Sequence, residues 1–309
     1  MASGLPPITR PVTVVPPLTP FDDDLRVDYR NLARVIDYVV DDCNASIVVA
    51  AGVEAQEYQY LDWEGRKELI TRTIDFVGGR RPVAVGVTHP SFKQAIELAQ
   101  LAEKRGAAFL QVLAPNRPIG GPTPTADIIA YFEAIARETS LPLMFYLNQG
   151  PGADPSPAAT VEIAKIDRVK YVKESSRDLS RVSRLIVEIE HAGHAHYFTT
   201  MQMLLASLML GGTGVTLPPP ASFLANKIIE AYVAGDIKEA ARLQLQFALF
   251  PARWMDAGMA TVMKHAMTYL GVPCGNPYPP YPPITGEKLA QLEAYLKTTD
   301  FKPAGSRNA

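Results

Sequence analysis

A lysine and a tyrosine, each ending a short apolar run, are the residues of this chain best placed to do chemistry. Lys173 ends the run Val169–Lys173, and Tyr146 ends the preceding run, Leu141–Tyr146. Desolvation at the tip of a buried strand favours a neutral amine, the form that attacks a ketone to give a Schiff base. An isolated lysine here would read as a surface residue that closes a strand. Tyr146 changes this interpretation, because strand ends of a parallel barrel converge on one site.

Strand-like and helix-like segments alternate along the chain and must position this pair. The strand-like runs are short, apolar and often β-branched, as strands buried on both faces should be. They are Val12–Val15, Ser46–Ala50, Pro82–Val87, Ala107–Leu113, Leu141–Tyr146, Val169–Lys173, His196–Thr199 and Gly214–Leu217. Amphipathic helical patterns lie between them. They include Val27–Asp42, Phe92–Arg105, Asp127–Glu138 and Leu179–Ile189. Ser156, Asp178 and Ser222 are predicted helix N-caps.

This alternation predicts an α/β protein, a (β/α)8 TIM barrel with a C-terminal helical extension. An open doubly wound sheet is the alternative, but the chain has no Gly-rich dinucleotide fingerprint. We expect an N-terminal tail at 1–11, the barrel at 12–234, C-terminal helices packed on the barrel at 235–297, and a tail at 298–309. The extra helices are predicted at Ile237–Met255, Met259–Leu270 and Thr285–Lys297.

The composition is that of an ordinary globular protein, with 47% apolar and 20% charged residues among 309. A net charge of −2 offers no electrostatic attraction to nucleic acid or to an anionic membrane. No apolar run is long enough to span a bilayer, and the first residues lack the pattern of a secretory signal. Cys43 and Cys274 are too few for a disulfide framework, so we expect free thiols in a reducing cytoplasm.

Four motifs carry a resemblance to a known family. Val172–Ser176 is similar to its "K-[DE]-S-S" Schiff-base motif, and Val15–Phe21 resembles the "TPF" ending of its first strand. Leu210–Val215 resembles its "LGGxGV" segment, and Pro283–Thr285 resembles the "P-L-T" start of its last helix. With Tyr146 and Lys173, the chain resembles the dihydrodipicolinate synthase / N-acetylneuraminate lyase family of class I aldolases and dehydratases over nearly its whole length.

The resemblance implies a Schiff-base-forming lyase that acts on a pyruvate-type 2-oxo acid by aldol cleavage, aldol condensation or dehydration. Lys173 would form the imine and Tyr146 would shuttle protons. Backbone amides of Val53 and Ala55 would hold the substrate carboxylate. No cofactor and no metal are expected, because the iminium is the electron sink. The resemblance also implies a homo-oligomer, a tetramer, whose C-terminal helices offer apolar surface to bury.

The chain departs from the family pattern after the second strand. The family has a Gly-Thr-Thr-Gly-Glu loop there, whereas this chain has Gly52–Glu57, with Glu54 and Ala55 in place of the two threonines. A hydroxyl relay cannot survive this change, although amide donors can. Glu54 is a candidate acid/base group with a pKa raised by burial. It could equally point away and pair with an arginine or lysine.

Two further departures bear on the substrate. Pro115–Pro118 has no tyrosine where the synthase has "Y-Y-N-R-P", and Tyr146–Gly152 lacks the synthase arginine that recognises the aldehyde partner's carboxylate. Lysine biosynthesis and sialic acid cleavage are therefore not expected. Thr199, Thr200 and Thr216, at the ends of the last two strands, are candidates to bind substrate hydroxyls, with packing as the alternative for each.

Other classes of function fit the sequence less well. A non-catalytic or sensing protein on the same scaffold would not need both Lys173 and Tyr146. A phosphate-ester isomerase would need a Gly-rich loop after the last strands, where Pro218–Pro220 stands. His191, His194 and His196 have a metal-like spacing, but they precede a strand at the stability face, where a solvated loop is expected.

Overall fold

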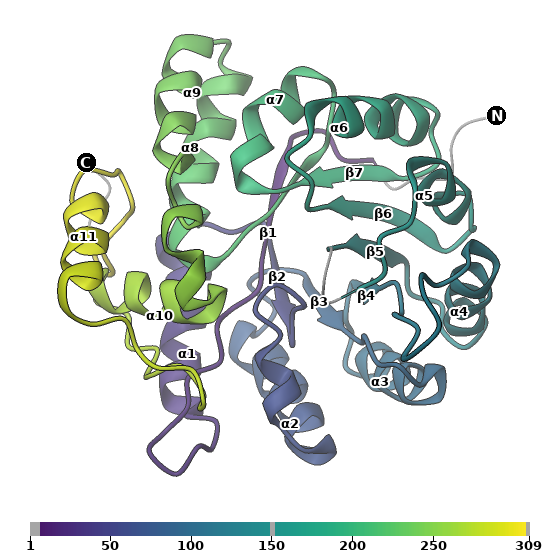
Figure 1. The fold of residues 1–309 in the computed structure, drawn as a ribbon, viewed down its shortest axis with the longest axis horizontal. Helices are drawn as coiled ribbons and strands as arrows, with labels where there is room; N and C mark the ends of the chain where they lie inside the picture. The colour runs from purple at the N-terminus through teal and green to yellow at the C-terminus, as the bar shows by residue number, and fades with distance from the viewer. Residues whose placement is uncertain (1–6, 149–151, 307–309) are drawn as a thin grey trace. The chain divides into compact units, whose positions relative to one another are not determined.

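Eight parallel strands, connected by helices, form the protein (Figure 1). The computed structural model describes residues 7–148 and 152–306. The strands close into a barrel in the order β1 to β8, which confirms the predicted (β/α)8 fold with additional C-terminal helices. Their bounds are β1 Val12–Val15, β2 Ile47–Ala50, β3 Val83–Gly86, β4 Phe109–Leu113, β5 Leu143–Leu147, β6 Val169–Glu174, β7 His196–Thr199 and β8 Gly214–Thr216.

The helices follow the predicted alternation. The α-helices are α1 Tyr29–Asp37, α2 Trp63–Val77, α3 Phe92–Lys104, α4 Thr125–Arg137, α5 Pro157–Ala164, α6 Leu179–Leu185, α7 Leu204–Met209, α8 Ser222–Val233, α9 Ile237–Gln244, α10 Met259–Tyr269 and α11 Gly286–Leu296. Two π-helical segments, η1 Tyr38–Asp42 and η3 Ile186–His191, extend α1 and α6. The short 3₁₀ segments are η2 Glu57–Tyr60, η4 Met201–Met203, η5 Pro219–Ala221, η6 Leu245–Phe247 and η7 Ala252–Ala257.

Local chemistry explains where several helices begin. The Ser156 side chain caps α5 by accepting a hydrogen bond from the Ala159 amide, and Pro157 occupies the first helical position. The Asp178 carboxylate caps α6 in the same way. The N-cap expected at Ser222 is wrong, because the 3₁₀ turn η5 runs directly into α8 and makes Ser222 the first helical residue.

The long helix expected over Ile237–Met255 is also wrong in extent. The α-helix α9 ends at Gln244, and the chain continues through η6 and η7. Pro251 separates these two short helices, and its nitrogen carries no hydrogen to continue a helical ladder. The apolar periodicity over this stretch therefore belongs to three short elements.

The chain divides into two compact units. The first contains residues up to Val12 together with Val83–Thr216, and so holds β3 to β8 and α3 to α7. The second contains Thr13–Pro82 and the chain from Leu217 onward, with β2, α1, α2 and α8 to α11. The predicted tails lie partly outside the described residues, at 1–6 and 307–309.

Strand register in the first unit decides which side chains share a face. On β5, Phe145 packs against Phe132 of α4, with ring centroids 5.0 Å apart, so Phe145 faces the helices. Side chains alternate along a strand, so its neighbour Tyr146 faces the barrel interior. Tyr146 pairs with Lys173, Lys173 with Phe198, and Phe198 with Gly214. These four residues therefore form one interior layer.

In the second unit, the segment after α11 packs against the helices and does not extend into solvent. Phe301 is 5% exposed and Lys302 is 7% exposed. The Tyr38 hydroxyl of η1 donates a hydrogen bond of 2.7 Å to the Lys302 carbonyl.

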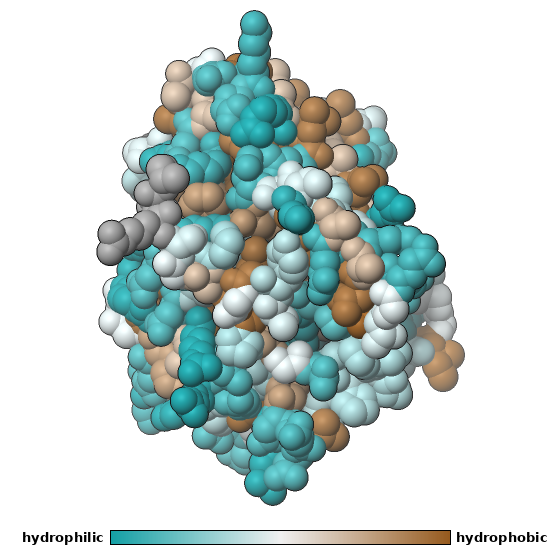
Figure 2. Space-filling view, turned by 90° about the vertical axis from the view of Figure 1, so that its left-hand side faces the viewer, coloured by the Kyte–Doolittle hydropathy of each residue, from teal (hydrophilic) through white to brown (hydrophobic). Residues whose placement is uncertain are grey.

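Figure 2 shows hydrophilic residues over most of the face that it views, with hydrophobic residues in small separate groups.

Candidate active site

Lys173 and Tyr146 meet in the interior of the first unit. Each side chain is 1% exposed, and the Lys173 amine lies 2.7 Å from the Tyr146 hydroxyl. The amine also sits 4.1 Å from the centre of the tyrosine ring. The pairing follows directly from the β5–β6 register, in which the two residues are opposite each other. An amine, which can act as a nucleophile when neutral, thus lies within hydrogen-bond distance of a hydroxyl that can carry a proton.

Ser175 completes the surroundings of the amine, and the sequence interpretation did not include it. The Ser175 hydroxyl lies 2.7 Å from the Lys173 amine and donates its own proton to the Leu147 carbonyl, also at 2.7 Å. Since that proton is committed to Leu147, the serine oxygen accepts from Lys173. Residues two apart in an extended segment share a face, so the spacing from Lys173 was a signal that could have found Ser175.

Glu174, between these two residues, points the other way and anchors the segment. One of its carboxylate oxygens accepts a hydrogen bond of 2.7 Å from the Arg181 guanidinium of α6, and the other accepts one of 2.9 Å from the Ser176 amide. Arg181 also donates to the Pro155 carbonyl at 3.1 Å. The end of β6 is thus held on its outer side while Lys173 and Ser175 face inward.

The three candidate threonines do not share a face. Thr199 follows Tyr197 by two residues on β7, so the register turns it to the face opposite Phe198 and Lys173. Thr216 follows Gly214 by two residues and lies on the Lys173 side. Both threonines are 0% exposed, and neither hydroxyl has a hydrogen-bond partner in the described chain. Thr200, just after β7, hydrogen-bonds through its hydroxyl to the Gln202 side chain at 3.1 Å.

The segment after β2 belongs to the second unit. Val53, Glu54 and Ala55 form a turn in which Val53 is fully buried and the other two are half-buried. Glu57, next to this turn, is buried against Lys264 of α10, with 3.0 Å between its carboxylate and the ammonium. Burial raises the pKa of Glu57, an effect that the Lys264 charge and the Thr19 amide oppose.

Aromatic rings gather around the same loops of the second unit. Tyr60 of η2 stacks on Tyr278, with ring centroids 4.6 Å apart and planes 6° from parallel. The Phe21 ring meets Tyr278 edge-on at 4.8 Å. Tyr278 lies in the Pro- and Tyr-rich linker before α11.

His196 of the histidine cluster pairs with a carboxylate that also binds neighbouring groups of the chain. His196 at the start of β7 lies 2.9 Å from the Glu190 carboxylate, which also accepts hydrogen bonds from the Tyr197 amide and the Thr213 hydroxyl. Over residues 7–148 and 152–306, no group of three or more His, Cys, Asp or Glu side chains is arranged to hold a metal ion. In that same part of the chain, no helix is both long and apolar enough to cross a membrane.

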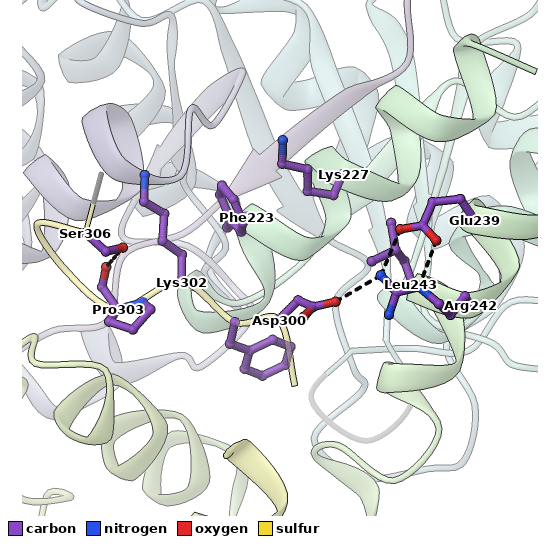
Figure 3. Close-up of a pocket in the computed structure, with 10 residues that line it drawn as sticks. Phe223, Lys227, Glu239, Arg242, Leu243, Asp300, Lys302, Pro303 and Ser306 are labelled. Atoms are coloured by element: carbon purple, nitrogen blue, oxygen red, sulfur yellow. Dashed lines mark hydrogen bonds and ion pairs between the residues drawn. The ribbon is translucent and has the colours of Figure 1, made fainter. Parts of the chain in front are cut away.

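A pocket of about 440 Å³ lies in the second unit, among α8, α9 and the segment after α11 (Figure 3). Its charged groups already compensate one another. Arg242 is paired with both Glu239, at 2.7 Å, and Asp300, at 3.2 Å. Lys302 donates to the Asp42 carbonyl at 3.0 Å. None of the predicted site residues lines this pocket.

The fold and the buried lysine–tyrosine pair define a closed (β/α)8 barrel with a lysine amine and a tyrosine hydroxyl in its interior. The chain belongs to the Dihydrodipicolinate synthetase family, whose sequence profile matches residues 12–299. This membership makes the protein an enzyme of the lyase class.

Individual relatives agree with this assignment. The chain is 30% identical over 290 residues to the 4-hydroxy-tetrahydrodipicolinate synthase of Acidothermus cellulolyticus, covering 92% of this chain and 91% of the relative. It is 26% identical to the Escherichia coli K12 prophage protein YagE, solved in complex with pyruvate, with a TM-score of 0.84 over 93% of this chain and 97% of YagE. The N-acetylneuraminate lyase of Fusobacterium nucleatum shares the fold at 20% identity, with a TM-score of 0.82 over 94% of this chain and 99% of the lyase.

Proposed function

We propose that this protein is a Schiff-base-forming lyase that acts on a pyruvate-type 2-oxo acid. The hydrogen bond of 2.7 Å between the buried Lys173 amine and the Tyr146 hydroxyl is the observation that carries the proposal. YagE, solved with pyruvate, supports the choice of a 2-oxo acid. A non-catalytic protein on this scaffold would have no use for such a buried pair.

The chemistry proceeds from the neutral amine. The Lys173 nitrogen adds to the ketone carbon, and Tyr146 relays a proton from nitrogen to the new alkoxide oxygen. A second proton, given by Tyr146 and replaced from solvent, lets this oxygen leave as water, and the protonated imine remains. The iminium then accepts the electron pair of a C–H bond, or of the next C–C bond, at the carbon beside it and becomes an enamine. The proton of the C–H bond passes to a base, whereas cleavage of the C–C bond releases an aldehyde as its hydroxyl gives up a proton. Protonation of the enamine carbon restores the imine. Hydrolysis of the imine returns the amine.

Substrate recognition draws on the loops around the barrel ends. In this proposal the amides of Val53 and Ala55 hold the substrate carboxylate, as the family motif implies. Thr216 shares the Lys173 face and binds a substrate hydroxyl, and Thr200 is a second candidate. Thr199 has no role in this proposal, because the register turns it toward the helices.

Glu54 is proposed as the acid/base group of the later step, either loss of water or retro-aldol release of an aldehyde. It stands where the family has a relay threonine, in a chain that also lacks the second relay tyrosine after the fourth strand. Glu54→Gln is then expected to leave imine formation intact and to slow the following bond-breaking step. Single-turnover kinetics that match the wild type would make Glu54 a spectator.

The proposal is tested by borohydride reduction in the presence of a panel of 2-oxo acids, with intact-mass measurement. We expect one adduct per chain with pyruvate or with the true substrate, and no adduct when the keto acid is omitted. Absence of an adduct across the panel, with the chain folded, would favour a non-catalytic role.

A homotetramer is proposed as the assembly. Apolar side chains stay exposed on the C-terminal helical segments, among them Leu245 at 71%, Leu249 at 43% and Met255 at 40%. Burial of such side chains between copies would stabilise the assembly. Sedimentation that shows a stable monomer at micromolar concentration would contradict it.

A further inference from the structure

A second buried lysine, Lys264 of α10, lies in the second unit. Its side chain is 1% exposed and that of its partner Glu57 is 2% exposed, with 3.0 Å between the charged groups. The Lys264 ammonium also donates to the Thr19 carbonyl at 2.8 Å and to the Asn276 carbonyl at 3.2 Å. The other Glu57 oxygen accepts from the Thr19 amide at 2.8 Å. Both backbone polar groups of Thr19 are thus bound by one ion pair.

The ion pair ties together segments that are far apart in the chain. Thr19 follows β1, Glu57 begins η2 after β2, and Asn276 precedes α11. Removing two charges from water is costly, and it is tolerated only where the charges meet each other and further hydrogen-bonding groups. Well-packed apolar residues often stabilise such a place as well as a buried ion pair does, so a buried ion pair is weak evidence of a purely stabilising role.

The segment that Glu57 ends is strained and crowded. Ala51 and Gln56, on either side of the Val53–Ala55 turn, have left-handed backbones with φ of 48° and 55°. Side chains other than glycine adopt this conformation at a cost, and it persists only where the surroundings enforce it. Between them, a Cβ added at Gly52 would lie 2.4 Å from the Pro16 Cβ, so the loop backbone packs directly against Pro16 at this point.

We infer that Lys264, through Glu57, is a positioning residue that holds the strained loop after β2 in the shape that binds the substrate carboxylate. This inference rests on the proposed function, because it assigns the loop amides to that carboxylate. Lys264 takes no part in covalent chemistry, since a carboxylate and two backbone carbonyls engage its ammonium.

The test compares pyruvate with methyl pyruvate, which has the same ketone but no carboxylate charge. The measured quantity is the rate of borohydride-trapped imine formation as a function of ketone concentration. Lys264→Met is expected to raise the half-saturating concentration of pyruvate by about tenfold or more, since a hydrogen bond to a charged group is worth about that factor. The rate at saturation and the response to methyl pyruvate should stay close to those of the wild type.

Lys302→Met is the matched control. Lys302 is a second nearly buried lysine of the same unit, which donates to the Asp42 carbonyl and lies 3.9 Å from the Asp42 carboxylate. Its loss should leave discrimination between the two ketones unchanged. If Lys264→Met does not fold, Glu57→Gln breaks the pair with the same side-chain shape, and the double variant removes both buried charges.

Three outcomes overturn the inference. Folded Lys264 and Glu57 variants that bind pyruvate like the wild type show that the loop needs no such support. Equal weakening of pyruvate and methyl pyruvate, or an equal effect of Lys302→Met, shows a general structural effect. If the wild-type protein forms no borohydride-trapped adduct with either ketone, the proposed function itself is contradicted and this inference loses its basis. If the wild type forms the adduct and the variants have the same half-saturating pyruvate concentration, only this inference is contradicted.

Discussion

The Lys173 amine and the Tyr146 hydroxyl lie 2.7 Å apart because the two residues are paired in register on adjacent strands. The contact does not depend on a loop conformation, since both residues lie within strands of five and six residues. Short parallel strands in a closed barrel leave little freedom for the two side chains to separate. The strand register therefore places the two side chains next to each other.

Tyr146→Phe is expected to lower kcat by about two to four orders of magnitude, the usual contribution of a general acid–base group. The ring remains and only the hydroxyl is lost, so the fold should persist. Tyr171→Phe is the control, because Tyr171 lies two residues before Lys173 on β6 and contacts Phe109 with ring centroids 4.8 Å apart. A Tyr146→Phe effect below about tenfold would show that another group moves the proton.

Ser175→Ala is expected to slow imine formation by about tenfold, because the amine loses one of the acceptors that orient it. The measurement is the rate of trapped imine at saturating keto acid. Ser176→Ala serves as the control, since the Ser176 hydroxyl accepts from the Asp178 amide instead. An unchanged rate in Ser175→Ala would show that Tyr146 alone orients the amine.

Thr216→Val and Thr199→Val form a matched pair of substitutions at fully buried threonines on adjacent strands. Each removes a hydroxyl without a partner in the described chain and keeps the side-chain volume, so neither should destabilise the fold. We expect Thr216→Val to raise KM for a hydroxylated substrate and Thr199→Val to leave it unchanged. Equal effects on KM would contradict the assignment of the two faces.

Burial raises the pKa of the Cys43 thiol to about 12 and raises that of Cys274 as well. The stability that comes from keeping these thiols protonated is complete below the ordinary pKa of a thiol and is lost as pH rises through the raised values. At pH 8 the folded protein should therefore not react with a thiol reagent, and both cysteines should react once it is unfolded in urea. Rapid labelling of the native protein would contradict this prediction.

Most of the fold could be predicted from the sequence, because the patterns that indicate strands and helices are local. Short apolar runs and capping residues such as Ser156 and Asp178 act within a few residues, and the structure has strands and helices where they predict them. Pro251 shows the limit, because apolar periodicity continues across a residue that cannot continue a helix. Lys173 and Tyr146 could be selected because the ends of parallel strands converge.

Other parts of the site depend on contacts that no local pattern encodes. Thr199 and Thr216 look equivalent in the sequence, and only the register between strands separates their faces. The Lys264–Glu57 pair joins a helix near the C-terminus to a loop near the N-terminus. The local sequence around either residue does not predict that it pairs with the other. Ser175 could have been predicted from the sequence, since it follows Lys173 by two residues and side chains two apart on a strand share a face.

The central claim is that Lys173, and not the other fully buried lysine, forms the imine. Peptide mapping after borohydride reduction with pyruvate tests this most directly. Hydroxyl groups accept hydrogen bonds from the Lys173 amine, whereas a carboxylate and two backbone carbonyls engage the Lys264 side chain. We predict an adduct on the peptide that contains Lys173 and none on the peptide that contains Lys264. An adduct on any other lysine, or full activity in Lys173→Ala, would contradict the claim.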